Sequence, residues 1–430
     1  MMVLEGSLLL FVGFAVLLLL GAPLAVALGA TGALVIFVEN LGIMSVPTNV
    51  YGGIAKYPLL ALPVFVLAGM VFERAGVALR IVRFTSALVG TRPGAQGIVA
   101  VLVCMVLGGI SGSGPADAAA VAMVMIPGMA KQGYPKAFSA SLIAAAGSTA
   151  ILIPPSIAFI VYSVLVPQAS VPALFAGGMI PGILAGLSLV VPVLYFSTKY
   201  RWGGEAEEER LPVWKSFREA IWGLAAPGII LGGLRSGFFT PTEAAVVAVF
   251  YGLFVGIVIY RSLDLRTIYR VLVESAEISA VVMIIIALAS VFAHAGNTLG
   301  AFDAFAKLLL GFTNNEVVML VMITIMILIA GMLLDGVSIF LVFLPILIPI
   351  MNAFKWDAVW FGVILTMNIA IGQFTPPMAV NLMVTSRIAG VSMESTVPWV
   401  IWMVAAMLVA LVLVTAFPAL ALWLPGVLGF

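Results

Sequence analysis

The sequence predicts an all-helical protein that crosses a membrane many times and consists of two related halves. Hydrophobic residues make up 63% of the 430 residues and charged residues only 9%. A soluble domain normally contains about 25% charged residues, so this composition excludes a water-soluble fold. In lipid, each backbone amide must be satisfied within a helix or a closed barrel, and the apolar runs do not alternate as barrel strands do. We therefore expect helices.

Composition also excludes several functional classes. Net charge is +1 and no basic run is present, which argues against a nucleic-acid partner. One cysteine and one histidine cannot form an internal disulfide or a metal site alone. No nucleotide-binding or hydrolase motif occurs, so we expect no enzyme and no organic cofactor. No Lys or Arg precedes Lys56, which is unlike a cleavable secretory signal.

The first membrane segment covers about Leu8 to Val38, with a kink or break at Gly21 and Pro23. Two later apolar blocks, Tyr57 to Arg74 and Ile278 to His294, are too short to cross twice but long enough to enter and return. We expect both to be re-entrant hairpins. His294 is expected to be an interfacial residue rather than a proton relay.

A glycine-rich break, GGISGSGPADAAA, interrupts an apolar region at residues 108–120. Gly112, Gly114 and Pro115 cannot sustain a regular helix, so carbonyls near mid-membrane lack intrahelical partners. Together with the hydroxyls of Ser111 and Ser113, these carbonyls are the oxygen ligands that Na⁺ needs. The following helix N-terminus would favour a carboxylate substrate. The alternative is a purely structural role in close helix packing.

Aspartates accompany two of the breaks. Asp117 follows the first, and Asp335 lies at a second one, GMLLDGVSIF, before Gly336 and Ser338. An aspartate at the bilayer centre costs about 2.5–3.5 kcal/mol and usually has a function. Asp335 is therefore predicted to coordinate a cation or the substrate, with an N-cap on the following helix as the alternative. For Asp117 a cap or packing role is weighted equally with function.

Paired prolines mark two further breaks. GSTAILIPPS contains Pro154, Pro155 and Ser156, and GQFTPPM contains Gln373, Thr375, Pro376 and Pro377. Consecutive prolines remove two amide donors and expose carbonyls one turn earlier. Ser156, Gln373 and Thr375 are thus expected to offer oxygen ligands at similar depth. A simple kink is the alternative.

The breaks recur with one spacing. Gly109, Gly114, Pro127 and the Pro154–Pro155 pair each have a counterpart 222 positions later. Shared glycines and prolines imply shared backbone shape, and duplicated halves with broken helices are typical of secondary transporters.

One charged stretch, residues 197–222, separates the halves and is expected to be a linker followed by an interfacial amphipathic helix. The arginines of residues 74–92 favour the cytoplasm for that segment. Counting each apolar stretch between this segment and the basic linker as a full crossing would place the linker on the outside of the membrane. One of these stretches must therefore not cross the membrane fully.

In its motifs, the chain resembles the large membrane subunit of tripartite ATP-independent periplasmic (TRAP) transporters. GGISGSGPADAAA, GYPKAF, IPPS, GFFTPTEAA and PLLALPVFVLAG occur in that family's order between about Leu59 and Pro377. The resemblance implies an elevator-type transporter with two re-entrant hairpins, two interrupted helices and Na⁺ at the hairpin tips. It maps Ser111 and Ser113 onto the family's serines in the first break and Asp335 onto its second-repeat aspartate. In this chain Leu333 and Asp335 lie opposite the two serines, so the two ion sites cannot be copies of each other. No arginine lies in the second break or hairpin to pair with a substrate carboxylate. The nearest candidate downstream is Arg387, and the partner of the carboxylate is left open.

The resemblance also implies a division of the chain and its partners. Residues 1–53, 171–274 and 396–430 would form the scaffold, and 54–170 and 275–395 the transport domain, with broken helices at 111–117 and 335–338. Partners would be a small four-helix membrane subunit, a periplasmic binding protein, membrane lipid and an organic acid, in the bacterial inner membrane. The alternatives are a single-component Na⁺/dicarboxylate symporter and a channel-like or structural scaffold.

Overall fold

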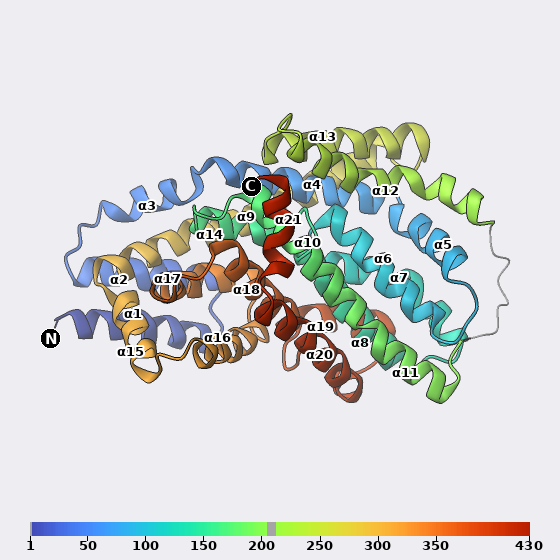
Figure 1. Ribbon diagram of the computed structural model, residues 1–430. Helices are drawn as coiled ribbons and strands as arrows, with labels where there is room; N and C mark the ends of the chain where they lie inside the picture. The colour runs from blue at the N-terminus through green and yellow to red at the C-terminus, as the bar shows by residue number, and fades with distance from the viewer. Residues whose placement is uncertain (1, 204–211) are drawn as a thin grey trace.

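The computed structural model describes residues 2–203 and 212–430, and these form helices joined by short loops, with no strand among them (Figure 1). Within these described ranges, six helices are long and apolar enough to span a membrane. The predicted all-helical membrane fold is confirmed.

The first membrane segment is two helices rather than one kinked helix. α1 (Met2–Leu19) ends before Gly21, which has a φ of 81°, and α2 (Leu24–Val38) starts after Pro23 and packs back on α1. α3 (Ser45–Ile54) follows, and a 3₁₀ turn, η1 (Tyr57–Leu60), leads into α4 (Ala61–Arg74). Proline fixes the backbone angle φ near the value that the first turn of a helix needs, which explains where α2 and η1 start.

Both predicted hairpin positions are wrong. α4 is a single helix without a reversal, and Ile278 to His294 lies inside α14 (Leu265–Thr298), which is uninterrupted over 34 residues. Pro58 and Pro63 fall in the first turns of η1 and α4, where a missing amide hydrogen costs nothing. α14 packs on α2, α3 and α4 and so links the parts of the first half.

The first re-entrant hairpin is instead made by α6 (Ala95–Ser111) and α7 (Gly114–Lys131). The Gly94 amide, before α6, donates to the Trp202 carbonyl, and the Gly203 amide donates to the Gln132 carbonyl, after α7. The two ends of the α6–α7 pair therefore lie together beside residues 202–203. The segment predicted as a broken helix at 111–117 is the hairpin tip, because Gly112 takes a left-handed φ of 63°.

An interrupted helix follows each hairpin. α8 (Lys136–Ser148) and the turn η2 (Thr149–Ile151) stop before Pro154–Pro155, and α9 (Ile157–Leu165) resumes after them. In the second half α18 (Ala358–Gly372) stops before Pro376–Pro377, and α19 (Val380–Ala389) resumes. Both proline pairs are joined by cis peptide bonds.

The second hairpin, α16 (Glu316–Gly331) and α17 (Gly336–Phe354), follows α15 (Ala301–Phe312). Its two ends meet through the Trp356 indole nitrogen, which donates to a Glu316 carboxylate oxygen at 2.7 Å. The segment predicted as a broken helix at 335–338 is thus also a hairpin tip, with its loop at residues 332–335. In Figure 1 the α6–α7 hairpin lies to the right of α18 and α19, and α17 lies to the left. The two hairpins therefore approach from opposite sides, as inverted repeats require.

The remaining helices surround these elements. They are α5 (Val77–Val89), α10 (Val171–Ser188), α11 (Val190–Tyr200), α12 (Val213–Arg235), α13 (Pro241–Phe254), the π-helix η3 (Val255–Ile259), α20 (Met393–Ala416) and α21 (Ala419–Leu428). The expected interfacial helix is only the start of the longer α12, and residues 204–211 of the expected linker lie outside the described residues.

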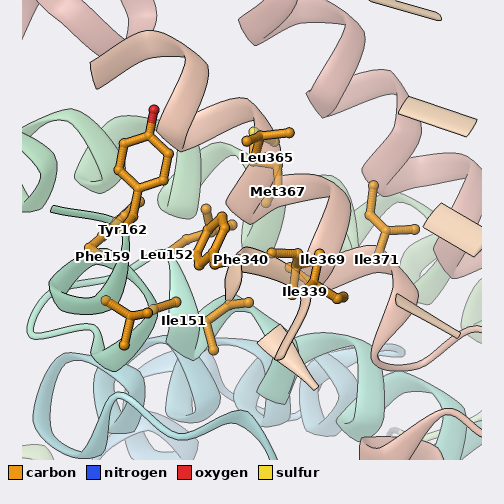
Figure 2. Close-up of a cluster of buried hydrophobic side chains, with 14 of the residues drawn as sticks. Ile151, Leu152, Phe159, Tyr162, Ile339, Phe340, Leu365, Met367, Ile369 and Ile371 are labelled. Atoms are coloured by element: carbon orange, nitrogen blue, oxygen red, sulfur yellow. The ribbon is translucent and has the colours of Figure 1, made fainter. Parts of the chain in front are cut away.

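Figure 2 shows that the buried core joins the two halves. Tyr162 of α9 packs against Phe340 of α17 with ring centroids 5.4 Å apart, and its hydroxyl donates to the Ala358 carbonyl at 2.8 Å. Side chains of the interrupted helices and hairpins thus form one apolar cluster, which also holds Leu152, Ile339, Ile369 and Ile371.

Candidate functional site

The tip of the first hairpin rests on the break of its own half. Gly112 lies so close to Pro155 that a Cβ atom on it would collide with the Pro155 carbonyl oxygen. The Ser113 amide donates to the Ser111 hydroxyl oxygen at 3.1 Å, which holds the tip loop in a tight turn. Glycine is required at 112 both for this approach and for the positive φ.

The same tip reaches the break of the other half. A Cβ on Gly114 would lie 2.9 Å from the Gln373 side-chain oxygen and 3.1 Å from the Asn381 side-chain nitrogen. Because glycine has no side chain, the start of α7 can approach these two amides. Pro115 is in the first turn of α7, where it leaves the helix intact.

The tip of the second hairpin contacts this break as well. The Ala379 amide donates to the Met332 carbonyl at 3.3 Å, and Gly331 packs directly on Gly372. A Cβ on Gly336 would lie 3.7 Å from the Gln373 side-chain nitrogen. Gln373 therefore lies between the two hairpin tips, next to both.

Two amide oxygens at this point have no hydrogen-bond partner in the described part of the chain. They are Oε1 of Gln373 and Oδ1 of Asn381, and both residues are buried. The Asn381 amide nitrogen atoms, by contrast, are used: its backbone donates to the Gln373 carbonyl at 3.0 Å and its side chain to the Ala144 carbonyl at 3.3 Å. A buried unpaired oxygen costs about 1–3 kcal/mol, and a hard cation would satisfy both.

Asp335 occupies the position that its N-cap alternative predicted. Its carboxylate accepts from the Ser338 amide at 2.9 Å and from the Ser338 hydroxyl at 2.6 Å, and its side chain is exposed. Ser338 is buried below it. Ser111 and Ser113 lie on the first tip and Asp335 on the second, and among the described residues no hydrogen bond connects Asp335 with either serine.

The other candidate hydroxyls contact the backbone. Ser156 donates to the Ile151 carbonyl and accepts from the Phe159 amide, which makes it the N-cap of α9. Thr375 donates to the Ile371 carbonyl at 2.6 Å. Each keeps a lone pair, but neither oxygen is orphaned as that of Gln373 is.

A small cavity of about 80 Å³ opens between the first tip and α4. Asp117 lines it with Ser111 and Ser113, and Glu73 of α4 faces the same space. Asp117 is buried, and its Oδ2 has no hydrogen-bond partner among the described residues. Neither the cap nor the packing ion pair weighed for Asp117 is found there.

Two buried amides were not predicted. Asn381 and Asn368 both have an orphaned oxygen, and Asn368 donates to the Ile364 carbonyl at 2.9 Å. Their signal in the sequence is a polar amide within an apolar segment near the second proline pair. Arg387, the nearest arginine downstream of the second break, is exposed in the last turn of α19, and His294 is half-buried near the end of α14.

Comparison with known sequences shows which family the chain belongs to. The family model described as "Tripartite ATP-independent periplasmic transporter, DctM component" matches residues 11–420. The isethionate TRAP transporter permease protein DctMQ of Oleidesulfovibrio alaskensis is 37% identical over 97% of this chain and 66% of its own length. The C4-dicarboxylate TRAP transporter large permease protein DctM of Pseudomonas aeruginosa is 39% identical over 94% of both chains.

A solved structure shares the fold. The chain superposes on the YdaH transporter of Alcanivorax borkumensis, whose topology is described as unusual, with a TM-score of 0.63 over 88% of this chain and 90% of that one. Sequence identity is 12%, so this likeness concerns the fold alone.

Proposed function

Because the chain belongs to the DctM family of tripartite ATP-independent periplasmic transporters, we propose that it moves a small organic acid across the membrane by sodium-coupled secondary transport. The main observation that supports this proposal is the position of Gln373. This residue is next to both hairpin tips, and its buried amide oxygen has no hydrogen-bond partner among the described residues. A cation bound there would connect the two tips.

Sodium ligands would come from the tips and breaks. Ser111, Ser113 and the carbonyls of residues 112–114 would supply the first site, and Asp335, Ser338 and Gly336 the second. Gln373, Thr375 and Ser156 would supply oxygens between them, with Asn381 added by the structure. Amide, hydroxyl and carboxylate oxygens are the hard ligands that such ions prefer.

An anionic substrate fits the same place. α7 and α17 both begin at the tips, and the positive end of a helix dipole attracts carboxylate or sulfonate groups. The relatives named above are described as transporting isethionate and C4-dicarboxylates, which are small organic anions. The class of substrate is therefore a small acid, selected by a separate binding protein.

The mechanism we propose is an elevator motion in the bacterial inner membrane. Residues 54–170 and 275–395 would move as the transport domain against the scaffold of residues 1–53, 171–274 and 396–430. A small four-helix membrane subunit would enlarge the scaffold, and a periplasmic binding protein would deliver the substrate. Both partners are expected from membership of the tripartite family.

Uptake by proteoliposomes tests the proposal. The protein is reconstituted with its small subunit, and labelled C4-dicarboxylates or isethionate are added with the cognate binding protein. We expect accumulation only with an inward Na⁺ gradient, and counterflow that requires Na⁺. Uptake that continues without Na⁺ would support a channel-like scaffold. So would a conductance that does not saturate when the concentration of the ion or of the substrate is raised. Full uptake without binding protein would support the single-component symporter.

A further inference from the structure

A groove with excess positive charge lies where α5, α12 and η3 meet, and none of its lining residues belongs to a hairpin tip. It encloses about 570 Å³. It is lined by Arg80, Arg83, Lys215, Arg218, Glu219, Trp222, Ile259 and Tyr260. Four of these side chains are basic and one is acidic, so the groove has a net positive charge.

One of the basic groups is held in place by its neighbours. The Arg80 guanidinium lies 3.6 Å from the centre of the Tyr260 ring and donates to the carbonyls of Ala75, at 3.2 Å, and Gly76, at 2.9 Å. The Tyr260 hydroxyl donates to the Glu219 carbonyl at 2.7 Å, which connects η3 with α12. The groove is therefore a built feature of the fold, formed by three separate elements.

The remaining charge is poorly compensated. Arg83 approaches the Glu219 carboxylate only to 4.0 Å, with half of the Arg83 side chain exposed. Lys215 and Arg218 lie one turn apart on the same helix and are both exposed. Gathering like charges costs free energy, and a bound anion would offset that cost.

The surroundings of the groove are apolar and exposed. Trp214, which is 74% exposed, precedes it on α12, and Trp222 lines it. Ile257 and Val258 of η3 are exposed next to it. In a multi-pass membrane protein, exposed tryptophans mark the headgroup level, and exposed aliphatic side chains face the lipid tails.

We propose that this groove binds the headgroup of an anionic phospholipid. The guanidinium groups of Arg83 and Arg218 and the ammonium group of Lys215 would hold its phosphate, since arginine and lysine both bind phosphate oxygens. The acyl chains would lie along Ile257 and Val258. A free phosphate would use the basic groups alone, whereas the adjacent apolar surface fits a molecule with both a phosphate and hydrocarbon chains.

Lipid retention measured by native mass spectrometry tests this assignment. The intact protein is exchanged into nanodiscs of phosphatidylcholine containing a minor share of phosphatidylglycerol, and bound lipid is counted after release. We expect the R83Q/K215Q/R218Q variant to retain phosphatidylglycerol about tenfold less than wild type, because each basic group near an anionic lipid contributes to its binding. The matched control, R92Q/R266Q/R270Q, removes three exposed basic groups outside the groove and should retain wild-type levels.

Three outcomes would overturn the assignment. One is equal loss in the groove variant and the control variant, and another is equal retention of phosphatidylcholine and phosphatidylglycerol by wild type. The third is displacement of the lipid by inorganic phosphate at similar concentration, which would indicate a free-anion site. Melting temperatures in pure phosphatidylcholine should be equal for all three proteins, so that misfolding of a variant is recognised. None of these measurements depends on transport.

Discussion

At the scale of single residues, Gln373 differs from its polar neighbours by the position of its free oxygen. Thr366, about two turns earlier in α18, is also buried, but its hydroxyl donates to the Gly362 carbonyl of its own helix at 2.7 Å. The Gln373 oxygen instead faces Gly114 at the first hairpin tip and has no partner in the described part of the chain.

Gln373→Met tests this difference. Methionine has a similar volume but no amide oxygen, so the break should keep its packing. We expect the Na⁺ concentration for half-maximal uptake to rise about tenfold, which corresponds to about 1.4 kcal/mol of binding free energy. Thr366→Val is the control and should leave the Na⁺ dependence unchanged. An unchanged Na⁺ dependence in Gln373→Met would exclude this oxygen as a ligand.

Asp335→Asn tests the role of the carboxylate charge separately from the role of this side chain as an N-cap. Asparagine is as good an N-cap as aspartate, so α17 should keep its bond from the Ser338 amide and the protein should assemble. If the carboxylate binds Na⁺ or orients the substrate, Na⁺-dependent uptake in proteoliposomes should be lost. Wild-type uptake would mean that Asp335 serves only as the cap that the structure contains.

At the scale of elements, glycine contacts decide how closely the second hairpin packs. Gly331 of α16 and Gly372 of α18 meet backbone to backbone, and a Cβ on Gly331 would lie 2.9 Å from the Gly372 Cα. Gly311 of α15 offers a contrast, since a Cβ there would meet nothing within 4 Å.

Gly331→Ala should therefore separate the hairpin from the interrupted helix. Overpacking of this kind costs about 1–3 kcal/mol, and we expect a lower melting temperature together with reduced uptake. Gly311→Ala should keep or slightly raise the melting temperature, because alanine favours helix more than glycine does. Equal melting temperatures for the two variants would contradict the close packing.

The breaks also show that a sequence can reveal where a helix is interrupted but not which way the chain runs afterwards. Gly112, Gly114 and the two proline pairs end helices where they were expected to, because their backbone preferences are local. Whether the chain then turns back or continues depends on contacts made far away, such as the Gly94 bond to Trp202. The tips at 112–113 and 332–335 were thus predicted as interruptions, and the structure shows that they are hairpin tips.

At the scale of the whole molecule, the α6–α7 hairpin resolves a conflict over orientation. Arg80 and Arg83 of α5 line one groove with Lys215 and Arg218 at the start of α12, so these basic residues lie on the same side. The conflict arose from counting residues 95–131 as a crossing, whereas they enter and return. With the basic residues together, the positive-inside rule assigns this side to the cytoplasm.

Single-cysteine labelling checks this assignment. In a Cys104→Ser background, a cysteine at Lys131 reports on the mouth of the first hairpin and one at Lys355 on the mouth of the second. In intact cells a membrane-impermeant maleimide should label only the Lys355→Cys variant, and both variants should be labelled after permeabilisation. Labelling of both from outside would refute the inverted arrangement.

By itself, the sequence determined the membrane class, the helical fold, the duplication and the position of every break in the two tips and two proline pairs. Composition and local backbone preferences are properties of the chain alone. The tertiary structure decided which helices reverse, which side the charges share and which oxygens stay unpaired. Asn381 illustrates the reason: its oxygen became significant only when α19 packed on α8 and the first hairpin tip approached it.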